Sequence, residues 1–244
     1  MIGSLVNAAG IVAGGLIGLR WSVPPSARTQ HRLRGLLGGA TLLFAFHLTW
    51  KSLGGSPGRM LGQFLLALLA MMIGRLIGRA LRLQRRLNRV GQFARDRLRA
   101  GEAGRLALGD SFTATAGLFC LTPLAVLGPL QEGLTGDFRL LLVKTAMEGL
   151  AMQTMVRQLG TGALFAALPV FVFQGTLTLG TRALQPWLEA QAMAGILGTT
   201  IGLLGTAVAL MILEVHKTLR SRPIEMADYL PSLVVAAFLG WLVL

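Results

Sequence analysis

Cysteine is almost absent from this chain of 244 residues, in which Cys120 is the single example. A disulfide within the chain is therefore impossible, and a zinc site built from several cysteines is excluded. The chain also contains no glycine-rich phosphate loop ending in lysine, no HExxH and no GxSxG motif. These absences argue against an ATPase and against an enzyme, and they suggest no cofactor and no bound metal.

Charged residues are scarce as well, at 14% of the chain, whereas 53% of the residues are hydrophobic. The mean hydropathy of +0.64 is too high for a water-soluble domain of this length. Apolar windows of about 20 residues, the length that crosses the hydrocarbon core of a bilayer, recur from end to end. We therefore predict an all-α fold in which residues 1–244 form one transmembrane domain.

The apolar windows predict a bundle of about eight membrane-spanning helices. They cover residues 2–19, 36–53, 61–81, 109–127, 138–156, 162–181, 192–213 and 229–244. The first window has neither a basic segment before it nor a clear cleavage site after it. We therefore expect a retained helix there and not a signal peptide.

Acidic residues are outnumbered by basic ones, 10 to 23, which gives a net charge of +13. The arginines collect beside apolar windows and not among base-stacking aromatic residues, so we expect no nucleic acid as a partner. By the positive-inside rule, the basic segments 20–34, 82–105 and 217–222 lie in the cytoplasm of a bacterial inner membrane. This arrangement places the N-terminus and the segment 131–137 outside.

Residues 81–106 interleave arginines with apolar residues, which predicts a basic amphipathic helix at the cytoplasmic surface. Anionic membrane lipids are the partner that such a helix would contact, through the arginines from Arg82 to Arg105. It could sense these lipids. The simpler interpretation is a solvated connector that fixes the topology.

Small residues recur at helical spacing in four of the expected spans. The stripes are Gly10, Gly14 and Gly18; Gly35 and Gly39; Gly74 and Gly78; and Gly198 and Gly202. Such stripes allow helix backbones to approach closely. We expect them to serve internal packing, although one of them could also hold a homodimer together.

A weak internal repeat links two passages that open with residues 38–49 and 202–213. Each passage is a glycine- and alanine-rich span followed by a short polar loop and another apolar span. With the orientation above, spans one to three and six to eight would form inverted repeats. Secondary transporters and some channels use this architecture. Spans four and five would then lie between the repeats.

Span five carries Lys144 and Glu148 in an otherwise apolar run, and their spacing of four residues puts both on one helical face. Each is costly in hydrocarbon, so they must pair or face an aqueous cavity. They could bind a cation, proton or anion, or they could be a structural ion pair. Asn7 and Gln174 lie within apolar spans, where interhelical hydrogen bonding is the commoner role and pathway lining the alternative.

Span four begins with Asp110 and Ser111 and is interrupted by Pro123. Proline frees backbone carbonyls, which is tolerated at membrane depth only where protein or water satisfies them. The glycine-rich segment after it, expected as a loop, carries Glu132 and Asp137. The broken helix beside this acidic loop could form an ion entrance or a re-entrant segment. The alternative is an ordinary proline kink followed by an external turn. We expect Cys120 to be a small apolar residue and not a nucleophile.

Several motifs together resemble a known family. They are MIGSLVNAAGIVAGGLIG at the start, GDSFTATAGLFCLTPLAVLGPLQEGLTGD in the centre, and then LLLVKTAMEGLAMQ and GALFAALPVFVFQGTLTL. The chain is similar over nearly its whole length to the bacterial membrane family called domain of unknown function 554. The resemblance implies a polytopic membrane protein and no established activity. It marks Asn7, Asp110, Ser111, Cys120, Gly128, Gly133, Gly136, Asp137, Lys144, Gly149, Gln174 and Gly175.

Glu132 and Glu148 depart from the family pattern, since aspartate is expected at both positions. His47 departs as well, where lysine is expected, and a polar residue expected near Met211 is lacking. The leading functional hypothesis is a transporter or channel for a small solute or ion. Its expected pathway residues are Asn7, Asp110, Ser111, Glu132, Asp137, Lys144, Glu148 and Gln174. The alternative is a non-transporting sensor or assembly scaffold. Transport predicts a water-accessible cavity that reaches Glu148, whereas a scaffold predicts a dry and fully paired site.

Overall fold

A computed structural model of the protein describes residues 1–20, 26–102, 108–190 and 193–243, and the regular structure in these ranges is entirely helical. The helices are α1 (Ile2–Arg20), α2 (Ala27–Ser52), α3 (Pro57–Ala80), α4 (Leu83–Glu102), α5 (Leu108–Cys120), α6 (Leu124–Thr135), α7 (Arg139–Leu159), α8 (Ala167–Ala190), α9 (Met193–Ile212), α10 (Val215–Thr218) and α11 (Ser232–Val243), with short 3-10 helices η1 (Thr161–Ala166) and η2 (Met226–Tyr229). The all-α prediction is therefore confirmed.

Five helical segments are long and apolar enough to cross a membrane, and the bent pair of α5 and α6 makes a sixth. The predicted count of eight is therefore not confirmed. The two expected spans that this measure omits, 36–53 and 138–156, correspond to α2 and α7. Charged side chains such as Arg34, Lys144 and Glu148 lower the hydropathy of those two helices.

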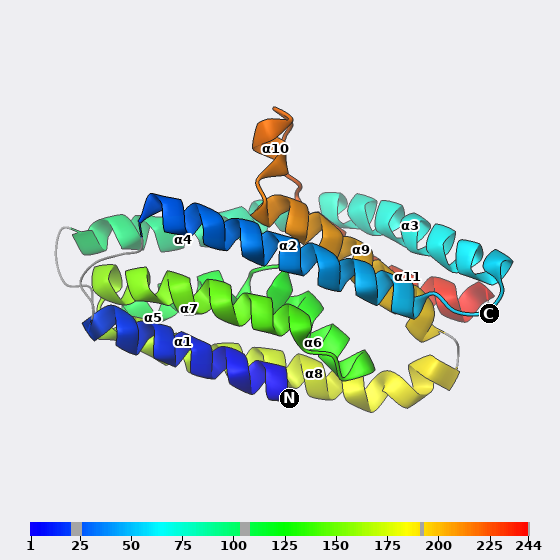
Figure 1. Cartoon of the computed structure of the whole chain (residues 1–244), viewed down its shortest axis with the longest axis horizontal. Coiled ribbons are helices and arrows are strands. Elements are labelled where there is room, and N and C mark those ends of the chain that lie inside the picture. The colour runs from blue at the N-terminus through cyan, green and yellow to red at the C-terminus, as the bar shows by residue number, and fades with distance from the viewer. Residues whose placement is uncertain (21–25, 103–107, 191–192, 244) are drawn as a thin grey trace.

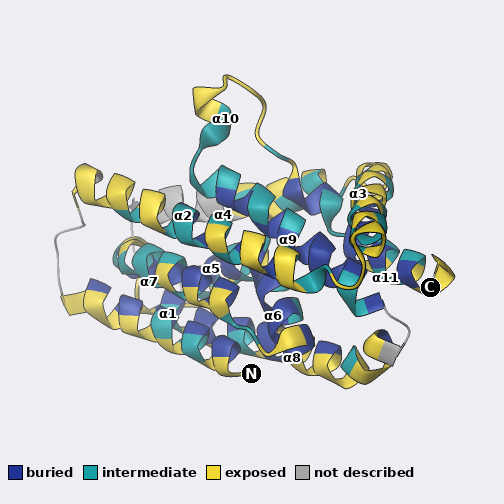
Figure 2. Ribbon diagram, turned by 45° about the vertical axis from the view of Figure 1, so that its right-hand side comes forward, coloured by how far each residue is buried: buried dark blue, intermediate teal, exposed yellow. Residues whose placement is uncertain are grey.

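The helices pack in a small number of close pairs. α1 lies along α7 with α8 beside it, α2 lies along α9, α3 packs against α11, and α6 packs against α8 (Figure 1). Figure 2 shows α6 and α9 largely buried, whereas α2 and α3 each expose a broad face. The centre of the bundle therefore lies around α6, α7 and α9.

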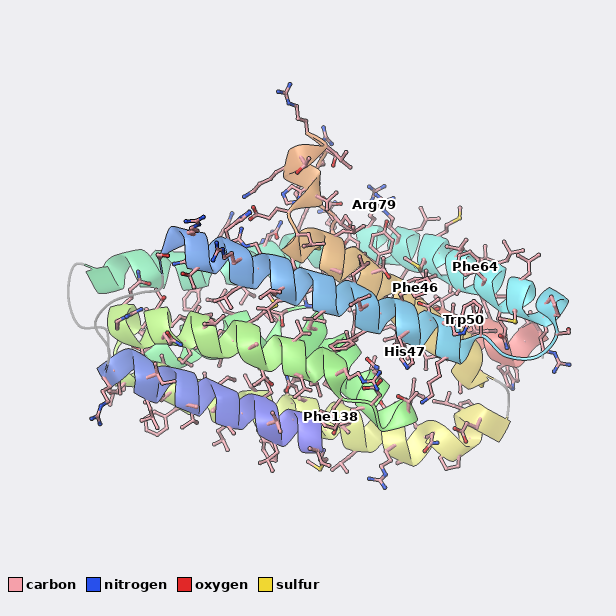
Figure 3. All side chains as sticks on the ribbon, viewed as in Figure 1. Phe46, His47, Trp50, Phe64, Arg79 and Phe138 are labelled. Carbon is pink, nitrogen blue, oxygen red and sulfur yellow. The ribbon has the colours of Figure 1, made fainter. Side chains whose placement is uncertain are left out.

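The exposed faces of the outer helices are apolar. Phe46 and Trp50 project from α2 (Figure 3) and are 67% and 64% exposed. Leu65 and Met72 on α3 and Leu168 on α8 are similarly exposed. A surface of this composition is unfavourable in water and suits a bilayer, because lipid chains cover it.

Three of the four glycine stripes form close helix contacts inside the chain, as predicted. A Cβ on Gly14 would overlap the backbone of Gly149 on α7, and one on Gly74 would overlap the backbone of Ser232. A Cβ on Gly202 would meet the backbone and side chain of Thr49. The stripe of Gly35 and Gly39 differs, because a Cβ there would meet no atom within 4 Å. Whether that stripe serves a homodimer stays a prediction.

Replacing Gly14 with valine is expected to lower the stability of the folded protein by about 1–3 kcal/mol, because backbone cannot move aside as a side chain can. Thermal denaturation of the detergent-solubilised protein measures the effect. Gly39→Val is the matched control, since it also changes a helical glycine but meets open space. Equal effects of the two substitutions would contradict the internal role of the first stripe.

The expected interruption of span four is present. The chain bends by 57° between α5 and α6, and Pro123 directly precedes α6. The glycine-rich segment beyond it differs from the prediction. Residues 131–135 are helical, and the turn comes only at Gly136, which adopts a left-handed φ of 74°. Glu132 is therefore a buried helical residue and not part of a loop.

The basic segment 81–106 forms helix α4 as far as Glu102, and its remainder, with Arg105, lies outside the described residues. Gln84 anchors the start of this helix, since its backbone N–H donates to Asp228 at 2.9 Å and its side chain accepts from Ala227 at 3.0 Å. Val90 and Phe93 are 37% and 42% exposed. The contact of this helix with anionic lipids stays a prediction.

Two basic segments expected on the same side of the membrane meet in the structure. Arg34 near the start of α2 forms an ion pair with Glu214 after α9, and Lys217 lies 2.9 Å from the same oxygen. The hydrogen bond from Lys217, together with the charge of Arg34, lowers the pKa of the Glu214 carboxyl. This contact therefore persists at neutral pH and is lost only as acid protonates the carboxylate.

Candidate functional site

Lys144 and Glu148 form an ion pair in the centre of the bundle. They lie one turn apart on α7, and 2% and 4% of their surfaces are exposed. The Lys144 ammonium donates to Glu148 Oε1 and also to the carbonyl of Phe119 at 3.1 Å. That carbonyl belongs to the last turn of α5, where Pro123, four residues on, has no N–H to donate to it, and the Thr122 hydroxyl donates to it as well at 3.3 Å. The Lys144 ammonium thus donates both to a carbonyl freed by the helix break and to the Glu148 carboxylate.

Two amides from other helices complete this central cluster. The Asn7 side chain of α1 donates from Nδ2 to Glu148 Oε2 at 2.9 Å and to Gln174 Oε1 of α8 at 3.1 Å. Both amides are fully buried. Asn7 Oδ1 and Gln174 Nε2 have no hydrogen-bond partner among the described residues. One acceptor and one donor therefore remain unused beside a buried charge of each sign.

A second buried cluster surrounds Glu132 on α6. Its Oε1 accepts from the backbone N–H of Gly3 at 2.9 Å and lies 2.9 Å from the amino group of Met1. Its Oε2 accepts from the Thr178 hydroxyl at 3.3 Å, and that hydroxyl lies 3.4 Å from Ser4 Oγ. The cluster thus joins α1, α6 and α8 through polar groups.

The two clusters are consecutive along the same pair of helices. Ser4 and Asn7 are three residues apart on α1, and Gln174 and Thr178 are four apart on α8. Residues at these spacings lie on one helical face. Buried polar side chains therefore follow one another along the contact between α1 and α8, from the Glu132 cluster to the Glu148 cluster. We call this series of side chains the polar line.

One end of the polar line opens on a cavity of about 590 Å³. Glu132 and Thr178 belong to its wall, and so do Lys51, Arg182 and Glu189, so both signs of charge border it. The size lies within the range of small-molecule sites. Water in this cavity can therefore reach the Glu132 cluster, but Glu148 is not part of its wall, so the cavity ends one helical turn before Asn7 and Gln174.

Beyond Glu148 the polar line ends in apolar packing. Met152 and Val156, the next residues on the same face of α7, are buried in a cluster that includes Ile11 of α1 and Phe119 of α5. Alanines of η1 and α8 complete that cluster. The bundle is thus polar from the cavity to Glu148 and tightly apolar after it.

Three predicted pathway residues lie apart from the polar line. Ser111 is buried near the start of α5, where its hydroxyl donates to the carbonyl of Leu159. Asp110 precedes it in the first turn of the same helix. Asp137 accepts from the backbone N–H of Arg139 at 3.0 Å in the turn between α6 and α7. The other five, Asn7, Glu132, Lys144, Glu148 and Gln174, are brought together.

Sequence reasoning missed the hydroxyls of Ser4 and Thr178, because such residues are common in apolar helices. They could have been found from their spacing of three and four residues from Asn7 and Gln174, which places them on the same helical faces. It also missed Gln131, which is buried with both polar side-chain atoms unpartnered among the described residues. Among all the residues that the structure describes, no three histidine, cysteine or acidic side chains lie close enough to hold a metal ion.

Comparisons with known proteins give a family and two curated relatives. The relatives are the uncharacterized membrane protein YdfK of Bacillus subtilis (strain 168) and the uncharacterized protein YqgA of Escherichia coli (strain K12). YdfK is 24% identical over 242 residues, which is 98% of each chain. YqgA is 24% identical over 238 residues, 97% of this chain and 94% of its own. No solved structure matches. Since residues 2–241 match the family described as "Protein of unknown function (DUF554)", this chain belongs to that family of membrane proteins.

Proposed function

We propose that this protein is a transporter or channel for a small solute or ion in the bacterial inner membrane. The observation that carries the proposal is the polar line, which leads from a cavity of about 590 Å³ past Asn7 and Gln174 to Glu148. Ionisable residues inside a membrane domain are costly and commonly mark the path of an ion or substrate.

The unpartnered atoms of the central cluster support this proposal over a purely structural role. A buried polar group without a partner costs about 1–3 kcal/mol. Asn7 Oδ1 and Gln174 Nε2 both stand in this position among the described residues. A site that binds and releases a ligand needs such groups, because the ligand supplies their partners.

The arrangement of helices supports transport by alternating access. The pairs α1 with α8, α2 with α9 and α3 with α11 pack together, an arrangement compatible with inverted repeats of spans one to three and six to eight, which secondary transporters use. With the N-terminus outside, the cavity opens to the exterior and the apolar packing around Met152 closes the cytoplasmic side. The described conformation then corresponds to an outward-facing state.

The rival function is a non-transporting sensor or assembly scaffold. The direct pairing of Lys144 with Glu148 favours it, since the pair can be purely structural, joining α7 to α5 through the Phe119 carbonyl and to α1 through Asn7. The exposed arginines of α4, among them Arg85, Arg86 and Arg89, would then contact lipid or a partner protein.

Flux through proteoliposomes containing the protein tests the proposal. The panel offered consists of ions, followed with pH- and ion-sensitive dyes, and of radiolabelled small uncharged and zwitterionic solutes, and the wild type is compared with Thr178→Val. This substitution keeps the shape of the side chain and removes the hydroxyl between Glu132 and Ser4. We expect it to slow flux roughly tenfold, equivalent to about 1.4 kcal/mol for one lost polar contact in the path.

Thr176→Val is the matched control, because Thr176 lies on the same helix, is exposed and bonds only to the carbonyl of Val172 among the hydrogen bonds described. Its flux should equal that of the wild type. Absence of flux across the whole panel, with a folded wild-type protein, would reject transport in favour of the scaffold. Equal slowing by both substitutions would reject the polar line as the path.

A further inference from the structure

The central cluster combines four groups of complementary character. Lys144 supplies a positive charge and Glu148 a negative one. Gln174 Nε2 is an unpartnered donor and Asn7 Oδ1 an unpartnered acceptor among the described residues. A ligand that satisfies all four must itself carry both charges, and it must be able both to donate and to accept hydrogen bonds.

We infer that the central cluster binds a small zwitterion that carries one ammonium and one carboxylate group, as short amino acids do. The inference rests on the proposed function and names the class of its substrate. The ligand carboxylate bonds to Lys144 Nζ and Gln174 Nε2. The ligand ammonium bonds to the Glu148 carboxylate and Asn7 Oδ1.

Unused hydrogen-bonding capacity at the ion pair supports this assignment. An ammonium group has three N–H donors, and in the described part of the chain Lys144 uses one for Glu148 and one for Phe119. Its third donor is available to a carboxylate. Each Glu148 oxygen accepts one hydrogen bond, and a carboxylate oxygen can accept two. Both ligand charges can therefore find a partner while Lys144 keeps its bond to the Phe119 carbonyl.

Charge balance excludes ligands with a single charge from this site. An anion alone would draw Lys144 from Glu148 and leave the glutamate as an unpaired buried charge. A cation alone would do the same to the lysine. Either outcome is strongly unfavourable inside a membrane domain. A zwitterion keeps the total charge of the site at zero, so no proton or ion must accompany it.

The cavity leading to the cluster has matching chemistry and size. Lys51 and Arg182 border it together with Glu189, so it offers partners to both ends of a zwitterion. Its volume of about 590 Å³ accommodates a small molecule of this class with its water. The ligand then passes the contact between Ser4 and Thr178 to reach Asn7.

Binding to the detergent-solubilised full chain tests the inference through thermal stabilisation at pH 6.5. The probes are glycine, alanine, serine, β-alanine and 4-aminobutyrate, each with its N-acetyl and amide derivatives. These derivatives keep only the negative or only the positive charge. We expect at least one zwitterion to bind, and both of its derivatives to bind roughly ten- to a hundredfold more weakly, as expected for a lost charged hydrogen bond.

Two substitutions locate the effect. Gln174→Leu and Asn7→Leu each remove a ligand contact and should weaken binding of the zwitterion roughly tenfold. Thr176→Val, on the exposed face of α8, should leave binding unchanged. Uptake of the labelled zwitterion by proteoliposomes, insensitive to collapse of the membrane potential, supports the inference further, because the loaded site carries no net charge.

The failures of the two proposals are distinguishable. If ions cross proteoliposomes but no zwitterion binds, transport stands and the zwitterion inference is overturned. Singly charged derivatives that bind as tightly as the zwitterion would overturn the inference in the same way. If neither flux nor binding occurs with folded protein, both proposals are overturned.

Discussion

Replacing Lys144 with methionine should destabilise the protein by about 3–5 kcal/mol, the cost typical of leaving one partner of a buried ion pair alone. Among the described residues, Glu148 would keep a negative charge with only the Asn7 amide to bond it, and the Phe119 carbonyl would lose its charged donor. Thermal denaturation in detergent, followed by loss of monodisperse protein, measures the change.

The double variant Lys144→Met with Glu148→Leu should recover much of this loss. Apolar residues of similar volume often replace a buried ion pair without net cost, because the desolvation of two charges disappears with them. Lys51→Met is the control, since Lys51 is exposed at the end of α2 and its loss should change stability little. A double variant less stable than Lys144→Met alone would contradict the assignment of a mutually dependent pair.

Replacing Glu132 with glutamine should reduce transport at least about tenfold while the fold is kept. The charge at the inner wall of the cavity disappears, although the amide oxygen can still accept from the Gly3 N–H. The Thr178 hydroxyl can rotate to accept from the new amide nitrogen. Flux in proteoliposomes measures the first effect and gel filtration the second, where a normal elution profile is expected.

Glu189→Gln is the matched control for this experiment. Glu189 borders the same cavity, but it is exposed and its partner is the Gln185 side chain one turn away. Its neutralisation should change flux less than twofold, since water screens an exposed charge. Equal losses in both variants would mean that the total charge of the cavity matters and that Glu132 has no particular role.

Local features of the site could be predicted from the sequence. Lys144 and Glu148 are four residues apart on one helix, so their pairing follows from helical geometry alone. The break before Pro123 could also be predicted from local sequence, because proline lacks the backbone N–H that would bond to the preceding turn. The need for a partner to the freed carbonyl was predicted as well.

Features that depend on distant parts of the chain could not be predicted. Asn7 meets Glu148 across 141 positions and Gln174 across 167, and neither contact leaves a trace in local spacing. The loop expected at 131–137 was wrong for residues 131–135, which are helical, and right only for the turn at 136–137. Gly133 is instead small because Thr181 and the Thr178 carbonyl pack against it. The glycine at position 133 is therefore explained by tertiary packing of α6 against α8 and not by a turn.

The contact of Gly14 with Gly149 also determines which helices can shift relative to each other. Backbone lies on backbone there, and Gly18 repeats the arrangement one turn later against Gln153. Two helices packed in this way move as one rigid body, because neither can rotate about its axis without a steric clash. The contact of α1 with α8 is different, since hydroxyls and amides bridge it at 3.4 and 3.1 Å. A rigid-body rotation of α1 and α7 together would therefore separate α1 from α8. The polar line lies along that contact.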